Sequence, residues 1–137
     1  MADTVRRIEY CYVTVPDQPG EALRVLTPLK ENGVSLLAYL AFPVGNNQAQ
    51  IDLVPENAAA LKQVAGKAGL ALSDVKRAFL IQGSDRAGAV ADTARKLADA
   101  KINITAAAAT TAGGGRYGMV LWVAPVDYER AAETLGV

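Results

Sequence analysis

The 137-residue sequence contains no histidine, a single cysteine, few aromatic residues and no excess of either charge. Without histidine, the chain lacks the commonest general base, the commonest metal ligand and the Ser-His and Cys-His catalytic arrangements. No paired-carboxylate or metal-ligand spacing replaces them. A small enzyme is therefore the least favoured class of function, and we expect no catalytic residue, no metal and no cofactor.

The balance of charges and the single cysteine limit the binding partners and the cellular compartment that we expect. Fourteen lysines and arginines offset fourteen acidic residues, which argues against a nucleic-acid or anionic-membrane surface. Cys11 cannot form an internal disulfide, and its place in a strand pattern favours a buried, inert thiol in a reducing compartment. No apolar run reaches membrane-spanning length, and no signal-peptide core follows the first residues. We expect a cytoplasmic protein.

What the sequence does contain is a short motif, Asp17-Gln18-Pro19-Gly20, with an echo at Asp85-Arg86-Ala87-Gly88. Each copy separates an alternating apolar run from a helical pattern. We expect the Asp to cap the helix and Pro19 to occupy its first position. A helix that starts this way presents free N–H groups, and Gly lets another molecule approach them, which suits a carboxylate or phosphate. The alternative is a well-capped helix without a ligand.

The patterns around the first motif predict the order strand, helix, strand, strand, helix, strand. The helices carry Ala22, Val25, Leu26 and Leu29, and then Leu61, Val64 and Ala65, on their inner faces. The expected strands are residues 8–15, 34–43, 49–53 and 70–72.

The same pattern then recurs 68 positions later, from Asp17 to Asp85. It predicts a strand over 75–83, a helix over 89–100 with Val90, Ala94 and Leu97 facing the sheet, a strand over 102–110 and a last helix capped by Asp127. We place a two-residue insertion in the hairpin at 112–115, after which the offset becomes 70. A register of this length indicates an internal repeat.

The predicted fold class is α+β, with two tandem ferredoxin-like (βαββαβ) units over residues 1–74 and 75–137. Each unit would be an antiparallel sheet with its helices on one face. The second unit lacks its last strand, which leaves a sheet edge open. We expect Thr4–Ile8, or a second copy of the chain, to pair with that edge.

The sheet face away from the helices is unusually apolar. In the first half it would carry Tyr10, Tyr12, Leu37 and Tyr39, and in the second half Leu80, Ala107, Ala109, Val120 and Trp122. Sheet aromatics of this topology can stack on RNA bases. The neutral charge and small alanines instead favour association, between the halves or between two chains.

Polar residues at the start of the second strand of each half, Ser35 and Asn103, are expected close to the turns. Backbone N–H groups together with a side-chain amide or hydroxyl can hold both ends of a zwitterion. Arg86 could add a charge-assisted bond to a carboxylate. The alternative is that all three are ordinary solvated residues.

These motifs resemble the ACT domain family. The segments 17–23 with 26–36 look like the start of one ACT domain, and 83–90 with 101–104 like a second. The resemblance implies a stand-alone regulatory module that binds an amino acid where two ACT units meet. It assigns ligand contacts to Asp17, Gln18, Pro19, Gly20 and Ser35, and to Asp85, Arg86, Ala87, Gly88 and Asn103. Ser35, Ala87 and Lys101 depart from the family's usual Asn, Pro and Gly, so binding could be confined to one half or lost from both.

Two functions follow. The first is a sensor that binds a small amino acid or similar carboxylate effector and thereby changes how ACT units associate. We expect this sensor to be a homodimer that associates through sheet or helix edges. The second is a ligand-independent regulatory or assembly subunit that acts on a separate metabolic enzyme.

Overall fold

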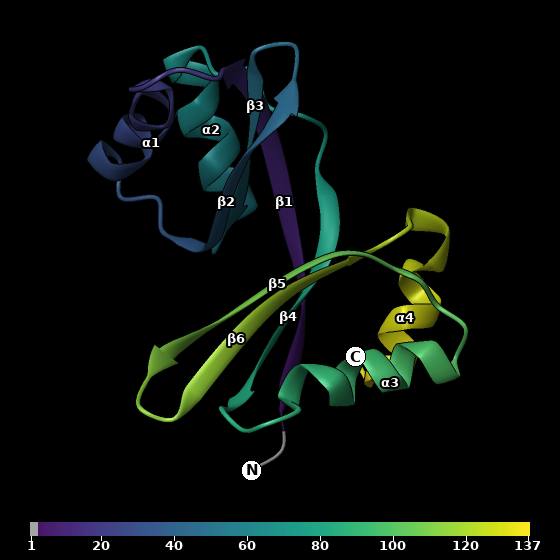
Figure 1. Cartoon of the computed structure of the whole chain (residues 1–137). Helices are drawn as coiled ribbons and strands as arrows, with labels where there is room; N and C mark the ends of the chain where they lie inside the picture. The colour runs from purple at the N-terminus through teal and green to yellow at the C-terminus, as the bar shows by residue number, and fades with distance from the viewer. Residues whose placement is uncertain (1–2) are drawn as a thin grey trace. The chain divides into compact units, whose positions relative to one another are not determined.

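The computed structural model describes residues 3–137 and shows an α+β fold (Figure 1). The order β-α-β-β-α occurs twice along the chain. The strands of the described chain form an antiparallel sheet with the hydrogen-bonded order β2-β3-β1-β4-β6-β5. The elements are β1 (Thr4–Pro16), α1 (Glu21–Glu31), β2 (Leu36–Gly45), β3 (Gln48–Pro55), α2 (Ala58–Ala68), β4 (Lys76–Ser84), α3 (Ala89–Asp99), β5 (Ile104–Gly113), β6 (Arg116–Val123), a 3-10 turn (Pro125–Asp127) and α4 (Tyr128–Leu135).

The chain divides into two compact units. Glu9–Lys76 forms one of them, and residues up to Ile8 join Arg77–Val137 in the other. Strand β1 therefore contributes its first residues to one unit and the rest to the other.

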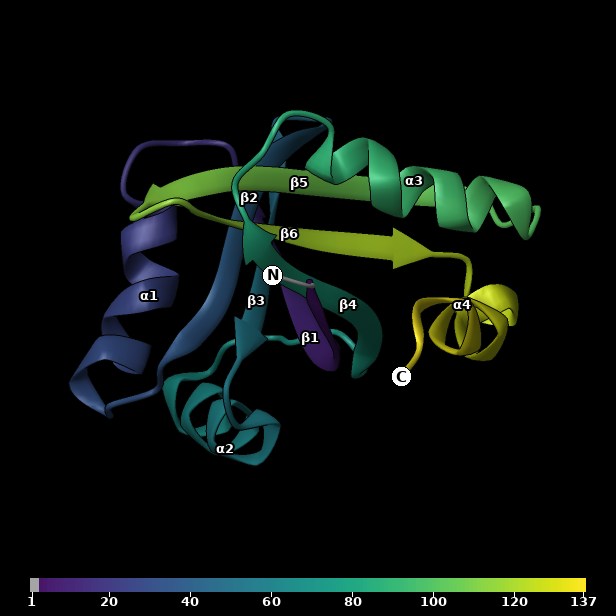
Figure 2. The same ribbon diagram turned by 90° about the horizontal axis from the view of Figure 1, so that it is seen from below.

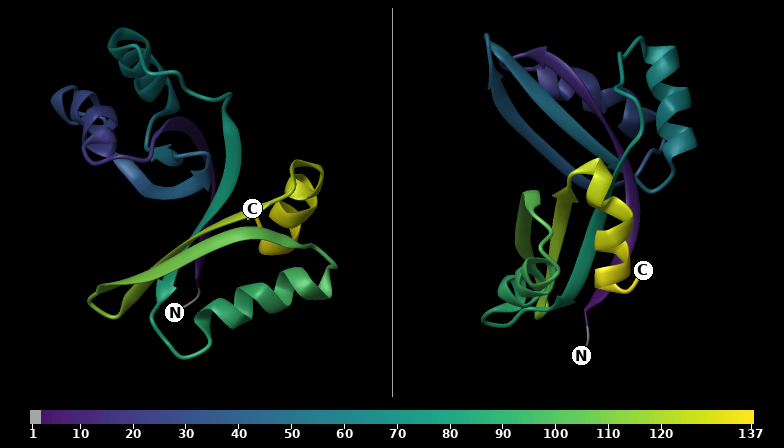
Figure 3. Two further views of the ribbon diagram at one scale, coloured as in Figure 1. Left: turned by 45° about the horizontal axis from the view of Figure 1, so that its top comes forward. Right: turned by 90° about the vertical axis from the view of Figure 1, so that its right-hand side faces the viewer.

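In the Glu9–Lys76 unit, β3 lies between β1 and β2, and α1 and α2 pack on one face (Figure 3). The predicted inner face of α1 is confirmed, because Val25 and Leu29 are buried against β1 and β3. In α2, Leu61 and Ala65 are buried. Asn57 caps α2 by accepting a bond from the Ala60 N–H at 3.1 Å.

In the other unit, α3 runs alongside β5, and α3 and α4 cover a core built on β4 and β6 (Figure 2). The open edge is occupied as expected: the first residues of β1 lie beside β4 in the same unit, and Thr4 Oγ1 donates to the Gln82 carbonyl at 3.4 Å.

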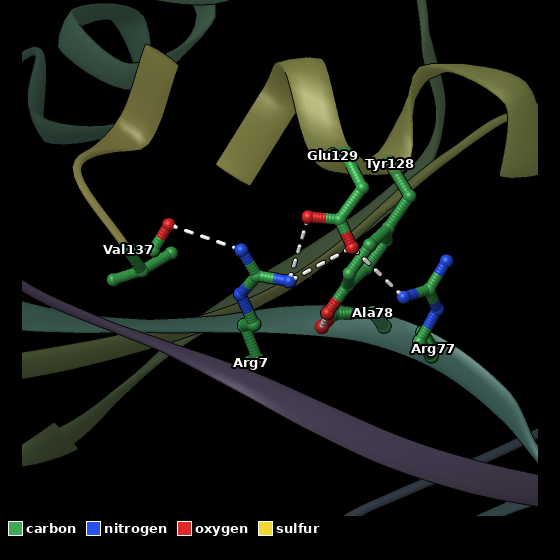
Figure 4. A network of polar contacts seen from close by, with 6 residues as sticks. All are labelled: Arg7, Arg77, Ala78, Tyr128, Glu129 and Val137. Atoms are coloured by element: carbon green, nitrogen blue, oxygen red, sulfur yellow. Dashed lines mark hydrogen bonds and ion pairs between the residues drawn. The ribbon is translucent and has the colours of Figure 1, made fainter. Parts of the chain in front are cut away.

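A polar and aromatic cluster attaches α4 to the strands of this unit (Figure 4). Glu129 accepts bonds of 3.0 Å from both Arg7 and Arg77. The guanidinium carbon of Arg77 lies 4.0 Å from the centroid of the Tyr128 ring. The Tyr128 ring stacks on the Phe79 ring with 4.6 Å between the ring centroids. The Tyr128 hydroxyl donates to the Ala78 carbonyl at 3.1 Å. The inner face of α4 is thus fixed by both packing and hydrogen bonds.

The internal repeat is visible in the strand register. Val13 pairs with Ile51 in the first repeat, and Ile81 pairs with Met119 in the second. Both members of the pair shift by 68 positions, so our two-residue insertion at 112–115 is wrong. The two hairpins are equally long. Strand β2 ends at Gly45 and β3 begins at Gln48, and β5 ends at Gly113 and β6 begins at Arg116, each 68 positions later. The extra residues lie after β6, where Ala124 and the 3-10 turn precede α4.

Two further expectations about elements are wrong. Residues 70–72 form no strand; the Leu72 N–H donates to the Leu70 carbonyl in a tight turn, and the Ser73 N–H donates to the Tyr12 carbonyl in β1. Val90 is 44% exposed, whereas Thr93 on the same helix is buried.

Three residues of the expected apolar sheet face are buried. Leu80 and Val120 are each 6% exposed and Trp122 is 8% exposed, although they lie outside the helix-covered core. Tyr39 stays 42% exposed. The buried Trp122 ring is not presented for stacking on a base, which weakens the RNA alternative. None of the helices within residues 3–137 is long and apolar enough to cross a membrane.

Candidate functional site

The two copies of the motif form the same tight turn. Gly20 and Gly88 adopt left-handed conformations (φ 91° and 83°), and bonds close the turns from Glu21 N–H to Gln18 and from Ala89 N–H to Arg86. This is the geometry of a type II turn, which needs Gly at its third position and favours Pro at its second.

The helix starts therefore differ from the sequence prediction. Gly20 and Gly88 are the N-cap residues, so Asp17 and Asp85 do not cap the helices and Pro19 precedes the first helical position. Neither helix receives a side-chain cap bond. The first N–H groups of α1 and α3 consequently have no capping side chain, and the acidic residues of their first turns are Glu21 and Asp92.

A hollow of about 210 Å³ lies beside the first turn. Its walls come from the end of β1, the start of α1 and the end of β2, with Asp17, Gln18 and Glu21 as its polar residues and Phe42 as its aromatic one. Because Asp17 and Glu21 are acidic, this hollow is poorly suited to a carboxylate.

A hollow of about 330 Å³ lies beside the second turn. It is lined by Asp85, Arg86 and Gly88, together with Thr110 and Tyr117. All of these except Gly88 correspond to lining residues of the first hollow at the 68-residue offset. Here Arg86 replaces Gln18 and Tyr117 replaces Ala49, which adds a cation and a hydroxyl donor.

Arg86 is already engaged by the protein's own carboxylates. One guanidinium nitrogen donates to Asp3 Oδ1 at 3.1 Å and the other to Asp92 Oδ2 at 2.8 Å. Tyr117 donates to Asp3 Oδ2 at 2.8 Å. Burial opposes the charge on Asp3, but the bonds from Arg86 and Tyr117 outweigh it and lower the pKa of the Asp3 carboxyl below its usual value. For Tyr117, burial and the neighbouring Asp3 raise the pKa of the phenol.

Ser35 and Asn103 do not lie near the turns of their own unit. In the strand register, Leu36 is level with Pro55, whereas Pro16 is level with Gln48 at the other end of β3. That separation is roughly 20 Å. Each helix returns the chain to the opposite end of the sheet before the second strand begins. The expected proximity within one unit is therefore wrong, and a role in ligand binding for these residues stays a prediction.

Sequence reasoning missed Asp3, Tyr117 and Gly83. The bonds of Asp3 span 83 and 114 positions, so no local pattern could reveal them. Gly83 offered one signal, because glycine within a strand often marks a close approach of other atoms.

No family model matches the sequence, and no curated protein matches it. Among solved structures, the chain is similar to protein BT0572 from Bacteroides thetaiotaomicron, with TM-score 0.81, 12% identity, and coverage of 96% of this chain and 88% of that one. It is also similar to the regulatory subunits of aspartate kinase from Thermus thermophilus (TM-score 0.62, 18% identity, 97% and 93% covered) and Thermus flavus (0.58, 21%, 98% and 93%). At these identities the likeness establishes the fold, which is consistent with the ACT-type fold that the motifs resemble.

Proposed function

We propose that the protein is a regulatory module, built from two tandem ferredoxin-like ACT units, that binds a small amino acid or a similar carboxylate effector. The observation that carries the proposal is the repeated site. Two left-handed glycine turns open two helices without side-chain caps, and each turn borders a hollow made from corresponding residues. The similarity in fold to regulatory subunits of aspartate kinase supports the regulatory class.

The second hollow is the better candidate for a carboxylate. It combines the start of α3 with Arg86 and Tyr117 and has one acidic residue, Asp85, whereas the first hollow has two, Asp17 and Glu21, and no cation. Ser35 and Asn103 immediately precede β2 and β5, at the ends of these strands that are far from the turns. In the proposal they contact an effector that is held by the turn of a second ACT unit, so that binding and association are coupled. The chain itself has no catalytic role in this proposal and acts on a metabolic enzyme.

A thermal-shift screen of the twenty amino acids at millimolar concentration tests the proposal. A ligand at 100 times its dissociation constant stabilises the folded state by about 2.7 kcal/mol, so binding would raise the melting temperature by several degrees. If none of the twenty changes the melting temperature, the amino-acid sensor is ruled out for these ligands.

Two matched variants locate the site. Ala41 and Ala109 are exposed residues that line corresponding positions of the first and second hollow. Ala109→Leu should fill the second hollow and abolish the ligand's effect, whereas Ala41→Leu should leave it unchanged. The reverse result would place binding in the first hollow.

A second candidate function rests on β5, which is an edge strand with every residue from Thr105 to Gly113 exposed. Such an edge is a template for pairing with another chain. A ligand-independent subunit that binds a separate metabolic enzyme through this edge would co-purify with that enzyme and would not respond in the amino-acid screen. A homodimer isolated with a bound amino acid would contradict it.

A further inference from the structure

The carboxylate of Asp3 lies in a recess that three residues of the second repeat create. Tyr117 donates to one of its oxygens and Arg86 to the other. The third residue is Gly83, where a Cβ atom would overlap the Asp3 carboxylate. A strand position without a side chain, flanked by a cation and a hydroxyl donor, is a fitted receptor for a carboxylate.

Tyr117 anchors the receptor in the core of its unit, whereas the Arg86 side chain is 38% exposed. Tyr117 is 5% exposed, and its ring packs with the buried core under α3 and α4. The Asp3 side chain is 16% exposed. Arg86 also bonds the Ser84 carbonyl at 3.2 Å and Asp92, which orient its guanidinium group.

The same two donors line the second hollow. When Asp3 occupies them, their bonding capacity toward a carboxylate is used by the protein itself. The first repeat has no such arrangement, because Val15, Gln18 and Ala49 stand at the positions of Gly83, Arg86 and Tyr117. Asp3 therefore engages donors that line the second hollow, Arg86 and Tyr117, and the first repeat offers no counterpart of these donors.

We propose that Asp3 is an internal competitor: Arg86 and Tyr117 form a carboxylate site, which the N-terminal segment occupies until a free carboxylate displaces it. The identity of the free carboxylate as an amino-acid effector rests on the proposed function, whereas the competition itself does not. If Asp3 occupies the site in about nine of ten molecules, the apparent affinity for a free carboxylate is reduced roughly tenfold.

Acetate is the probe for this competition, because it reproduces the end of the aspartate side chain. We would titrate sodium acetate into the wild type, Asp3→Ala and Asp3→Asn, with sodium chloride at equal ionic strength as the salt control. The readout is the NMR signal of ring-labelled tyrosine at Tyr117, assigned with Tyr117→Phe. The matched control is Glu133→Ala, which removes an exposed carboxylate from the same unit.

In Asp3→Ala, acetate should return the Tyr117 signal to its wild-type position, with half-saturation at a concentration at least roughly tenfold lower than in the wild type or Glu133→Ala. Adding Arg86→Gln to Asp3→Ala should remove the response. Equal half-saturation in wild type and Asp3→Ala, or a response that survives Arg86→Gln, would overturn the proposal. Asp3→Asn keeps the side-chain shape without its charge and gives the same test if Asp3→Ala fails to fold.

The result is separable from that of the amino-acid screen. An acetate response in Asp3→Ala without any amino-acid ligand would retain the carboxylate site and reject the sensor. Amino-acid binding that Ala41→Leu abolishes, combined with no acetate response, would retain the sensor and reject the competition.

Discussion

Lys101 and its counterpart Gly33 both adopt a positive φ angle, but only Gly33 lacks a Cβ atom. Lys101 adopts a left-handed conformation with φ 59°, where the corresponding Gly33 has φ 67°. For a residue with a Cβ atom this conformation costs about 1–2 kcal/mol, whereas glycine accepts it freely. The second repeat therefore carries local strain just before β5.

We expect Lys101→Gly to relieve this strain. The gain is reduced by the greater freedom of glycine in the unfolded chain, so the net increase in the free energy of unfolding should be about 0.5–1 kcal/mol. Urea denaturation of the variant beside the wild type measures it. The matched substitution Gly33→Lys should lower stability; equal stability of both variants with the wild type would show that the left-handed position carries no strain.

Asp52 is a buried carboxylate, 5% exposed, whose pKa is raised above its usual value by burial, with a hydrogen bond from Gln50 acting in the opposite direction. A raised pKa means that folding favours the protonated form, so stability is greatest below the usual aspartate range and falls as the pH rises through the folded value. Asp52→Asn should therefore be more stable than the wild type at pH 7, and the difference should shrink toward pH 3. Urea denaturation at both pH values, with the exposed Asp74→Asn as control, checks the sign.

At this scale, the sequence identifies which residues matter more readily than what they do. The glycines at 20 and 88 were recognisable, but the distinction between a helix cap and a type II turn depends on backbone angles that residue types only bias. Asp3 could not be found, because its partners come from the other end of the chain.

Among the elements, α4 makes both exposed ion pairs and buried aromatic contacts with its strands, and the two should differ in their contribution to stability. Glu129 joins two arginines, but its side chain is 65% exposed, where water screens ion pairs. Tyr128 is 2% exposed, stacks on Phe79 and bonds Ala78. Burial rather than charge should fix this helix to its strands.

Tyr128→Ala should consequently lower the free energy of unfolding by about 3–5 kcal/mol, as large aromatic truncations in cores do. Glu129→Gln should have a much smaller effect. Chemical denaturation at low and high salt compares the two. A large, salt-sensitive loss in Glu129→Gln would contradict this ranking.

The order of elements was largely predictable, because hydrophobic periodicity and the 68-residue repeat reinforce each other. The strand over 70–72 was not, since three apolar residues do not reveal whether a neighbouring strand offers them a hydrogen-bonded register. The position of Ser35 failed for a related reason. Which end of a sheet a strand starts from depends on the path of the preceding helix, and only the three-dimensional register shows it.

For the whole molecule, the exposed edge strand β5 is the feature that favours association between chains. An exposed edge strand with small residues from Ala106 to Ala109 is a template for pairing with a second chain. We expect a homodimer in solution. Ala108→Lys, which places a charge on this edge, should shift the sedimentation mass toward the monomer, whereas Ala59→Lys on the exposed side of α2 should leave it unchanged. A monomeric wild type would contradict the expectation.

The division of β1 between two compact units has a consequence for biosynthesis. The unit of Glu9–Lys76 is contiguous, so it can fold as soon as those residues have left the ribosome. The segment before it, Thr4–Ile8, belongs to the unit that is translated last. Its partner strand β4 is made about 70 residues later, so a chain truncated after Lys76 would lack the strand with which Thr4–Ile8 pairs.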